Sequence, residues 1–332
     1  MSEKKWYKGD CHLHTTNSDG KNSPEALYEM LYQRGLDFAF ITDHNCNTVG
    51  DKRLDYKGMT VIPGLEITGD LGHVNVWGEN IPITRIERPK TEERYNELLD
   101  TVRKVGGTVS INHPYDRRFG WDIGLDKTEF NCVELWNSPM HSDNVYCKDW
   151  WHGELLKGRF IPAVGGSDYH QDYLGVTHLL ASPTTYVYAA SNSMEDIVDG
   201  IRKGHVFVTN APSSACLYLT GGEAVPGDTV AFNGGNYVQV RIAHLRRRQT
   251  LRVWCNDEVL FTVTAPADKG LYNVFESIRV PEKGFVRAEV GFKLNKAEEL
   301  VYATAASKLH YHDKGEKVPE LYLAFTNPIF FK

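Results

Sequence analysis

An alternation of strand-like and helical segments over residues 7 to about 210 limits the fold of this chain more than any other feature. Ser23, Thr91 and Ser193 each stand where an N-cap precedes a helical pattern, and the third pattern ends at Gly204. Short β-branched or aromatic runs lie between these patterns, at 38–42, 60–63, 108–112, 130–136, 160–164 and 205–208. Strands that alternate with helices form parallel sheets or barrels, so we predict an α/β fold with the rhythm of a (β/α) barrel.

The pattern changes after residue 210. Helical periodicity stops there, and short alternating segments such as VQVRIAHLR, TLRVWCN and GFVRAEVGF follow, separated by turn residues. A chain of 332 residues is long enough for about two domains. We therefore predict a barrel domain over residues 1–210 and a smaller C-terminal β-sandwich domain over residues 213–332.

Composition argues against several classes of partner. The net charge of −6 disfavours a diffuse electrostatic grip on nucleic acid or anionic lipid. No apolar stretch approaches the ~18 residues of a membrane span, and the first residues lack the apolar core of a signal peptide. The six cysteines are spaced singly and are predicted to be reduced thiols. We expect a cytoplasmic protein with a small-molecule substrate and no nucleic-acid or membrane partner; a homo-oligomer stays open.

Two histidines in the segment CHLHT give the first sign of chemistry. His12 and His14 are two residues apart, so on a strand both side chains point to one face about 6.5–7 Å apart and can reach one metal ion. The spacing alone is weak evidence. The same spacing recurs at His310 and His312, where a charged context predicts a solvent-exposed turn instead.

Further metal-ligand residue types follow the predicted strands. FAFIT runs into His44, TVIPG into Glu66, TVSIN into His113, and IPAVGG into Asp168 and His170. In a (β/α) barrel the carboxyl ends of all strands open onto one face, where residues remote in sequence converge. With one residue in the turn after the first strand and one in GHVNVWG, the predicted metal ligands are His12, His14, Asp19, His44, Glu66, His73, His113, Asp168 and His170.

These segments carry a family resemblance. The motifs GDCHLHT, SDG, ITDHN, GLEIT, GH, NHP and GGSDYH, spread over most of residues 8–171, resemble those of the polymerase and histidinol phosphatase (PHP) superfamily of metal-dependent hydrolases. Their order, with the later VELWN and AFTNPIFF, is most similar to the carbaryl-hydrolase-like (CehA/McbA) branch. The resemblance implies a distorted (β/α)7 barrel that holds two or three divalent metal ions at the carboxyl ends of its strands.

The resemblance also implies how the ligands divide. A first ion would be held by His12, His14, Glu66 and Asp168. Glu66 would bridge to a second ion, which would also be held by His73 and His113. A third would be held by Asp19, His44 and His170. Many family members carry His where this chain has Asp19, so the filling of the third site stays open. Mixed nitrogen and oxygen ligands suit zinc, manganese or iron, and the sequence does not choose among them.

The sequence offers no protein nucleophile, because it has neither a GxSxG motif nor a cysteine beside an activating motif. Water, as a metal-bridging hydroxide, is therefore expected to attack. Asp43 is predicted to orient ligands or shuttle the proton, with a plain strand-end acceptor as the alternative. Arg117 and Arg118 are predicted to clamp a phosphoryl or carboxylate oxygen, with exposed loop arginines as the alternative. Asn137 is predicted to shape the substrate pocket.

These features predict a metal-dependent phosphoesterase that acts on a small phosphomonoester or phosphodiester. A carbamate, carboxylester or amide hydrolase with the same metal centre is the alternative, because the same centre can activate water against a carbonyl carbon. A third hypothesis is a binding protein without catalysis, in which the ions stabilise the fold.

Overall fold

The computed structural model describes residues 3–139, 141–172, 179–268, 270–308, 318 and 320–332. His310 and His312 lie outside the described residues. The helices are α1 (Pro24–Gln33), α2 (Glu92–Lys104), α3 (Asn144–Leu156), α4 (Met194–Lys203) and α5 (Lys296–Lys308). Within the described part of the chain, no helix combines the length and apolar character needed to cross a membrane.

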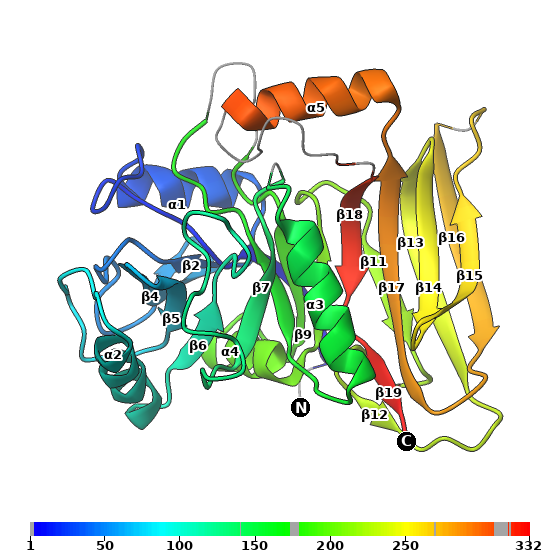
Figure 1. Ribbon diagram of the computed structural model, residues 1–332, viewed down its shortest axis with the longest axis horizontal. Coiled ribbons are helices and arrows are strands. Elements are labelled where there is room, and N and C mark those ends of the chain that lie inside the picture. Colours follow the sequence, from blue (N-terminus) through cyan, green and yellow to red (C-terminus); the bar gives the residue numbers. More distant parts are fainter. Residues whose placement is uncertain (1–2, 140, 173–178, 269, 309–317, 319) are drawn as a thin grey trace.

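The strands fall into a first group before residue 210 and a second group after it (Figure 1). The first group is β1 (Lys5–Asp10), β2 (Phe38–Ile41), β3 (Leu54–Tyr56), β4 (Met59–Gly69), β5 (Gly72–Trp77), β6 (Thr108–Ile111), β7 (Cys132–Asn137), β8 (Ala163–Gly166), β9 (Thr184–Ala189) and β10 (Val206–Thr209). The second group is β11 (Leu217–Thr220), β12 (Thr229–Val230), β13 (Tyr237–Arg246), β14 (Gln249–Cys255), β15 (Glu258–Thr264), β16 (Leu271–Arg279), β17 (Gly284–Lys293), β18 (Glu320–Thr326) and β19 (Ile329–Phe331).

The three predicted helix starts are confirmed. Ser23 Oγ accepts the Ala26 N–H at 3.2 Å, and Thr91 and Ser193 cap α2 and α4 in the same way. Each cap satisfies one of the backbone N–H groups that a helix start leaves without a partner. These helices therefore begin where their side chains specify, as the sequence alone indicates.

The expectation that no helix follows residue 210 is wrong. Helix α5 lies there, and Figure 1 shows it above the strands of both parts of the molecule. Its sequence, KAEELVYATAASK, has no amphipathic repeat but is rich in alanine and other strong helix formers. Leu300 and Val301 are exposed on it, which agrees with a helix formed by intrinsic propensity rather than by burial of one face.

A large mixed sheet runs through the molecule in the order β12-β19-β17-β18-β10-β9-β1-β2-β4-β5-β6-β7-β8. Pairs β1–β2, β2–β4, β6–β7 and β7–β8 are parallel, which confirms the mixed α/β class. Beyond the ends of β1 and β8 the chain also meets itself, since the His14 N–H donates to the Tyr169 carbonyl and the Asp168 N–H to the His12 carbonyl. The sheet therefore curls until β8 reaches β1.

The connection from β4 to β5 departs from a strict alternation of strands and helices. These two strands form an antiparallel hairpin, and β5 also pairs antiparallel with β6. Gly72, the first residue of β5, directly follows the turn between them at φ +115°, a conformation that an L-residue rarely adopts. A Cβ at Gly72 would also lie 2.3 Å from the Gly120 carbonyl oxygen. This glycine-dependent turn reverses the chain directly, without a crossover helix.

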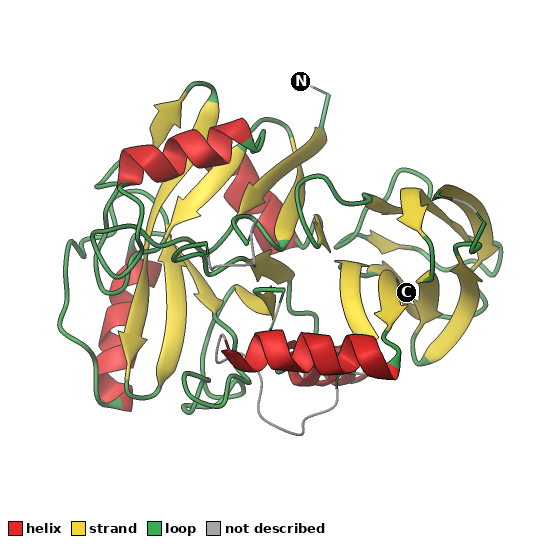
Figure 2. Cartoon of the chain, turned by 90° about the horizontal axis from the view of Figure 1, so that it is seen from above, coloured by secondary structure: helices red, strands yellow, loops and turns green. Residues whose placement is uncertain are grey.

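The C-terminal strands form two facing layers. The three-stranded sheet β11-β13-β16 packs against β14, β17 and neighbouring strands across a shared apolar cluster that includes Leu219, Val240, Val253 and Ala288. Figure 2 shows this strand-rich part beside the part that carries most of the helices. The two parts are not separate sheets, because β18 pairs antiparallel with β10.

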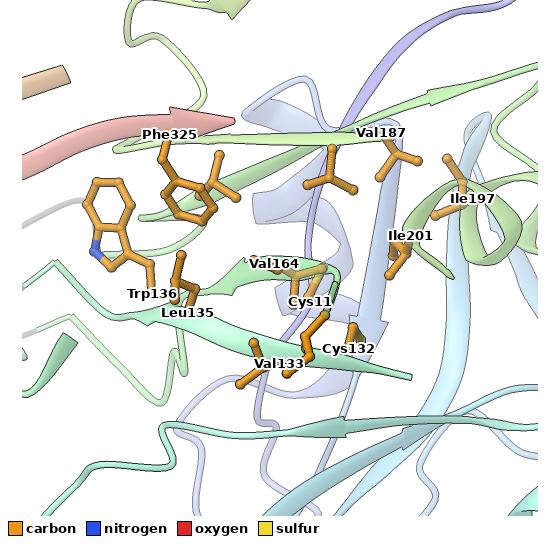
Figure 3. Close-up of a cluster of buried hydrophobic side chains, with 14 of the residues drawn as sticks. Cys11, Cys132, Val133, Leu135, Trp136, Val164, Val187, Ile197, Ile201 and Phe325 are labelled. Carbon is orange, nitrogen blue, oxygen red and sulfur yellow. The ribbon is translucent and has the colours of Figure 1, made fainter. Parts of the chain in front are cut away.

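An apolar cluster joins the two parts. Cys11, Val133, Val164 and Val187 lie inside it, and Phe325 of β18 contributes from the C-terminal part (Figure 3). The Phe325 and Trp136 ring centroids are 6.4 Å apart. Burying such an aromatic side chain contributes about 1.5–3 kcal/mol, so the contact holds the C-terminal strands firmly against the first part. All six cysteines are free, as the sequence predicts.

Candidate metal centre

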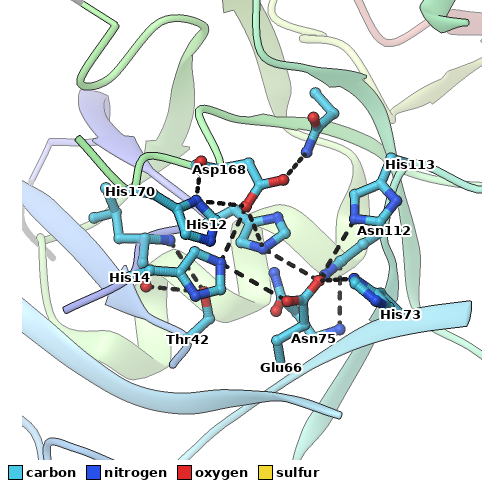
Figure 4. Close-up of polar contacts among 12 residues, drawn as sticks. His12, His14, Thr42, Glu66, His73, Asn75, Asn112, His113, Asp168 and His170 are labelled. Carbon is cyan, nitrogen blue, oxygen red and sulfur yellow. Dashed lines mark hydrogen bonds and ion pairs between the residues drawn. The ribbon is translucent and has the colours of Figure 1, made fainter. Parts of the chain in front are cut away.

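The centre begins at the end of β1, where His12 and His14 follow the last paired residue. Both side chains are fully buried, and their ring centroids are 5.1 Å apart. Their Nε2 atoms both lie close to one oxygen of Asp168, at 3.4 Å from His12 and 3.0 Å from His14. The segment beyond β1 therefore places both imidazoles beside the same carboxylate, which comes from a loop more than 150 residues away (Figure 4).

Glu66, in the middle of β4, lies among five imidazoles. Its Oε2 is 2.6 Å from His44 Nδ1, and its Oε1 is 3.1 Å from His73 Nδ1 and 3.3 Å from His12 Nε2. The remaining two imidazoles approach it at 3.7 Å and 3.5 Å, from His14 and His113. Oε1 also accepts a hydrogen bond from the side chain of Asn112 at 2.8 Å. The Glu66 carboxylate is thus the geometric midpoint of the site.

A third group lies nearer the solvent. Asp19 Oδ1 is 3.1 Å from His170 Nε2 and 3.6 Å from His44 Nε2. The His170 ring stacks on His14 with centroids 4.1 Å apart. The Asp19 side chain is 59% exposed, those of His44 and His170 are 23% exposed, and His14 is inaccessible. The site therefore opens to solvent on the Asp19 side.

The structure brings together all nine predicted ligands. Potential donor atoms lie within 4.8 Å of one another in three overlapping groups, which are His12–His14–Glu66, His44–Glu66–His73 and His14–Asp19–His44–His170. Asp168 and His113 contact these groups through the distances given above.

Several buried nitrogen and oxygen atoms of the site that could bind a metal ion make no hydrogen bond. Among the residues that the structure describes, these buried atoms include His12 Nε2, both ring nitrogens of His14, His113 Nδ1 and Asp168 Oδ1. Leaving a buried polar atom without a hydrogen bond costs about 1–3 kcal/mol. A divalent cation would satisfy these nitrogen and oxygen donors, so the residues fit the metal ions that the sequence implies.

The charges of the site also fit a cation. Burial acts to raise the pKa of Glu66, but the imidazoles of His73 and His12 hold it well below its usual range. Burial lowers the pKa of His14 to about 3, so its imidazole is neutral at pH 7, the form that binds metals. Burial acts to lower the pKa of His113, but the hydrogen bond of Glu66 and the charges of Asp168 and Glu66 raise it to about 9, so a metal ion that binds this imidazole has to displace a proton. The carboxylates therefore stay ionised and stabilise positive charge among them.

Glu134 is a functional residue that sequence reasoning missed. It lies in β7 and is 2% exposed, and its Oε1 is 3.0 Å from His12 Nδ1. Its Oε2 accepts the His113 N–H at 3.1 Å and the Asn137 side-chain N–H at 3.0 Å. A carboxylate on the far nitrogen of a ligand histidine fixes its tautomer and orientation. The available signal was a single acidic residue inside the apolar strand CVELWN.

Asp10 was also missed, and it fixes the end of β1. Its carboxylate accepts the backbone N–H groups of His12, Ser167 and Ala181, and the hydroxyl of Ser167. Burial raises the pKa of Asp10 to about 6 against these lowering hydrogen bonds. The three backbone contacts hold the His12 and Asp168 segments side by side.

Asp43 faces a loop rather than the ligand cluster. Its carboxylate accepts hydrogen bonds from the backbone and hydroxyl of Thr15, both at 2.7 Å, from Ser18 Oγ at 2.6 Å, and from Thr48 Oγ1. Four donors occupy all of the roughly four lone-pair sites of a carboxylate. This geometry favours the acceptor alternative, and a proton-shuttle role for Asp43 stays a prediction.

The predicted substrate contacts lie at different depths. Asn137 is buried, and its amide is 3.3 Å from Asp168 Oδ2. Arg117 is 46% exposed, with Nε 3.5 Å from Asp143 Oδ1. The Arg118 guanidinium lies over the ring of Phe119, at 5.4 Å from its centroid. That ring in turn stacks on His73, with the two centroids 5.2 Å apart. Asn137 thus lies at the ligand cluster and Arg118 near its rim, and their substrate roles stay predictions.

The fold and the site together define a class: a mixed α/β protein whose His, Asp and Glu clusters indicate divalent-metal binding. No protein-family model matches the chain, and no curated protein matches it.

Solved structures give distant matches. A two-domain protein from Bacteroides vulgatus, which contains a predicted PHP-like metal-dependent phosphoesterase, is 20% identical, with 86% of this chain and 90% of that chain covered and a TM-score of 0.49. PsfC from Pseudomonas syringae is 18% identical, with 55% and 82% covered and a TM-score of 0.41. An amidohydrolase from Chromobacterium violaceum, with bound sulfate and no metal, is 15% identical, with 51% and 90% covered and a TM-score of 0.36. At these values, the function of this chain has to be inferred from its own residues.

Proposed function

We propose that the chain is a metal-dependent hydrolase, and specifically a phosphoesterase that acts on a small phosphomonoester or phosphodiester. The observation that carries the proposal is the position of Glu66, a buried carboxylate with five imidazoles within 3.7 Å. A structural metal site closes around one ion with about four ligands. Nine candidate ligands on one solvent-open face exceed that need and favour catalysis.

The ligand set would hold two or three divalent ions, with zinc, manganese and iron all compatible with mixed nitrogen and oxygen donors. Divalent ions bound there supply Lewis acidity, which polarises a phosphoryl or carbonyl oxygen and lowers the barrier to attack by water. We also propose that the chain belongs to the carbaryl-hydrolase-like branch of the PHP superfamily and is located in the cytoplasm. In this proposal, residues 1–210 form a distorted (β/α)7 barrel and residues 213–332 form a β-sandwich domain.

The chain's own residues prepare the site for this reaction. Glu134 and Asp10 orient His12 and hold its segment against that of Asp168, which lowers the reorganisation needed during the reaction. Asp19 lies at the solvent side, so the substrate enters there. Arg118, near the rim, would then donate to an anionic oxygen of the substrate.

The test is a substrate panel on purified protein loaded with Mn²⁺ or Zn²⁺. We expect cleavage of p-nitrophenyl phosphate or bis-p-nitrophenyl phosphate, and loss of that cleavage in His12→Ala. The matched control is His244→Ala, because His244 is an exposed histidine on β13, remote from the site in sequence and in the sheets. Its activity should equal that of the unmodified protein.

Other outcomes replace the proposal. Cleavage of p-nitrophenyl acetate or an aryl carbamate, without cleavage of either phosphate, would establish the carbonyl hydrolase. Metal-dependent melting without turnover of any phosphate, ester, carbamate or amide would establish the binding protein. Equal phosphatase activity in His12→Ala would show that a contaminant causes the turnover.

A further inference from the structure

Three more metal-ligand side chains meet outside the nine-residue centre. Asp116 follows His113 in the loop after β6, and His141 and Asp143 lie just before α3. One donor atom from each lies within 4.8 Å of the other two. Asp116 Oδ2 and His141 Nε2 are 3.2 Å apart. Two adjacent ligands on one ion are about 3 Å apart when each bond is about 2.1 Å long, so the spacing fits a shared ion.

The Asp116 carboxylate is held in place by its own loop. Its Oδ1 accepts the backbone N–H groups of Arg118 and Phe119 at 2.7 Å and 2.8 Å. These bonds fix the carboxylate plane and leave Oδ2 directed at His141. A ligand that is positioned before binding loses little side-chain entropy when an ion arrives.

Burial and charge favour a cation at this cluster. Asp116 and His141 are buried, and the Asp143 side chain is 12% exposed. Two carboxylates this close in a poorly solvated place repel one another unless positive charge lies between or beside them. Arg117 supplies part of that charge, with Nε 3.5 Å from Asp143 Oδ1. An ion would compete with this guanidinium, so it would bind more weakly than an ion at Glu66.

The cluster is next to the first centre but distinct from it. The His141 ring is parallel to that of His113, with centroids 6.4 Å apart and an angle of 4° between the planes. No residue belongs to both sets of ligands. His141 also lines a small cavity of about 50 Å³ together with residues of α3, β7, β17 and β18.

We propose that Asp116, His141 and Asp143 form an additional divalent-cation site. Two carboxylate oxygens and one imidazole nitrogen form a harder donor set than the histidine-rich centre, and Mn²⁺ is the first-row ion that suits it best. Three protein donors leave coordination positions open for water or for an anionic group, as in exchangeable sites. The site does not depend on what the first centre catalyses.

The test counts ions rather than turnover. Chelator-treated full-length protein is dialysed against a Mn²⁺ series, and elemental analysis gives Mn²⁺ per chain. We expect His141→Gln and Asp143→Asn each to bind one ion fewer than the unmodified protein. The matched control is Asp149→Asn, which makes the same change at a 67% exposed side chain of α3, and it should bind the full number.

Equal Mn²⁺ counts and equal affinities in all four proteins would overturn the inference. Circular dichroism and thermal unfolding verify that each variant is folded. A second measurement needs no variant: anomalous diffraction from crystals soaked in saturating Mn²⁺ should show a peak among Asp116, His141 and Asp143, and its absence would also overturn the inference. Because neither readout uses hydrolysis, a failure of the proposed phosphoesterase activity leaves both results unaffected.

Discussion

The substitution Glu134→Gln tests whether the buried carboxylate behind His12 controls metal binding. The variant keeps the side-chain volume but replaces one carboxylate oxygen with an NH₂ group. Glu134 Oε1 is 3.0 Å from His12 Nδ1, while Oε2 accepts from His113 N–H and Asn137 Nδ2. An amide cannot satisfy both sides, because its NH₂ would face either the two donors or the proton of His12. His12 then loses the orientation that directs Nε2 to the metal.

The expected magnitude follows from this geometry. Loss of a partner on the far nitrogen of a ligand histidine lowers metal affinity by about 10- to 100-fold. That corresponds to about 1.4–2.8 kcal/mol of binding free energy. Since Glu134 also holds the His113 backbone, we expect the upper part of this range.

The assay is competition for Zn²⁺ or Mn²⁺ against a chromophoric chelator, which gives the dissociation constant of each protein. Glu154→Gln is the matched control, because Glu154 is also largely buried but contacts Lys157 and Arg159, which follow the C-terminal end of α3. Its affinity should be unchanged. If Glu134→Gln binds metal within about twofold of the unmodified protein, the orienting role is refuted.

Three further predictions concern stability. Asp43→Asn removes a carboxylate that accepts four hydrogen bonds, so it should lower the free energy of unfolding by about 1–3 kcal/mol. Urea titration measures this change, and the metal content should stay the same. A lower kcat with unchanged stability would instead support the proton-shuttle role. Removing metal with a chelator should lower Tm, and metal at 100 times its dissociation constant should restore about 2.7 kcal/mol, as calorimetry would show. Burial and the charge of Arg287 lower the pKa of His152, so the folded state favours its neutral form. The contribution of neutral His152 to the free energy of unfolding is therefore complete above pH 6.5 and is lost as the pH falls below that value. Protonation removes the His152 Nδ1 acceptor to which Arg287 Nε donates at 3.2 Å. His152→Gln should therefore show a smaller fall in the urea unfolding midpoint between pH 7 and pH 5. The same fall in the variant and in the unmodified protein would contradict this prediction.

Local signals in the sequence predicted the parts of the fold that depend on neighbouring residues. Ser23, Thr91 and Ser193 cap the helices that the patterns indicated, because a cap acts on N–H groups two or three residues away. Helix α3 carries no side-chain cap bond, and α5 has no amphipathic repeat, so neither was predicted. The β4–β5 hairpin was hidden for a related reason: its strands are nearly all buried and lack the alternation that marks a half-exposed pair.

The candidate metal ligands could be predicted from the sequence because both the residue type and its position after a strand depend only on neighbouring residues. Imidazoles and carboxylates at strand ends converge once the sheet curls, and the nine expected side chains lie together around Glu66. Glu134 could not be assigned a role in the same way, since 122 positions separate it from His12. The pairing of β7 with β8, and the contact of the segment after β8 with that of His12, bring the two side chains together.

The sequence by itself determined which residues can bind a cation and where three of the helices begin, because ligand chemistry and capping belong to single residues and their neighbours. The tertiary structure decided the pairing of β18 with β10, the carboxylate behind His12, and the meeting of Asp116 with His141 and Asp143. These contacts join segments whose separation along the chain leaves no periodic trace. They form only when burial of the common apolar cluster fixes the sheets and loops in space.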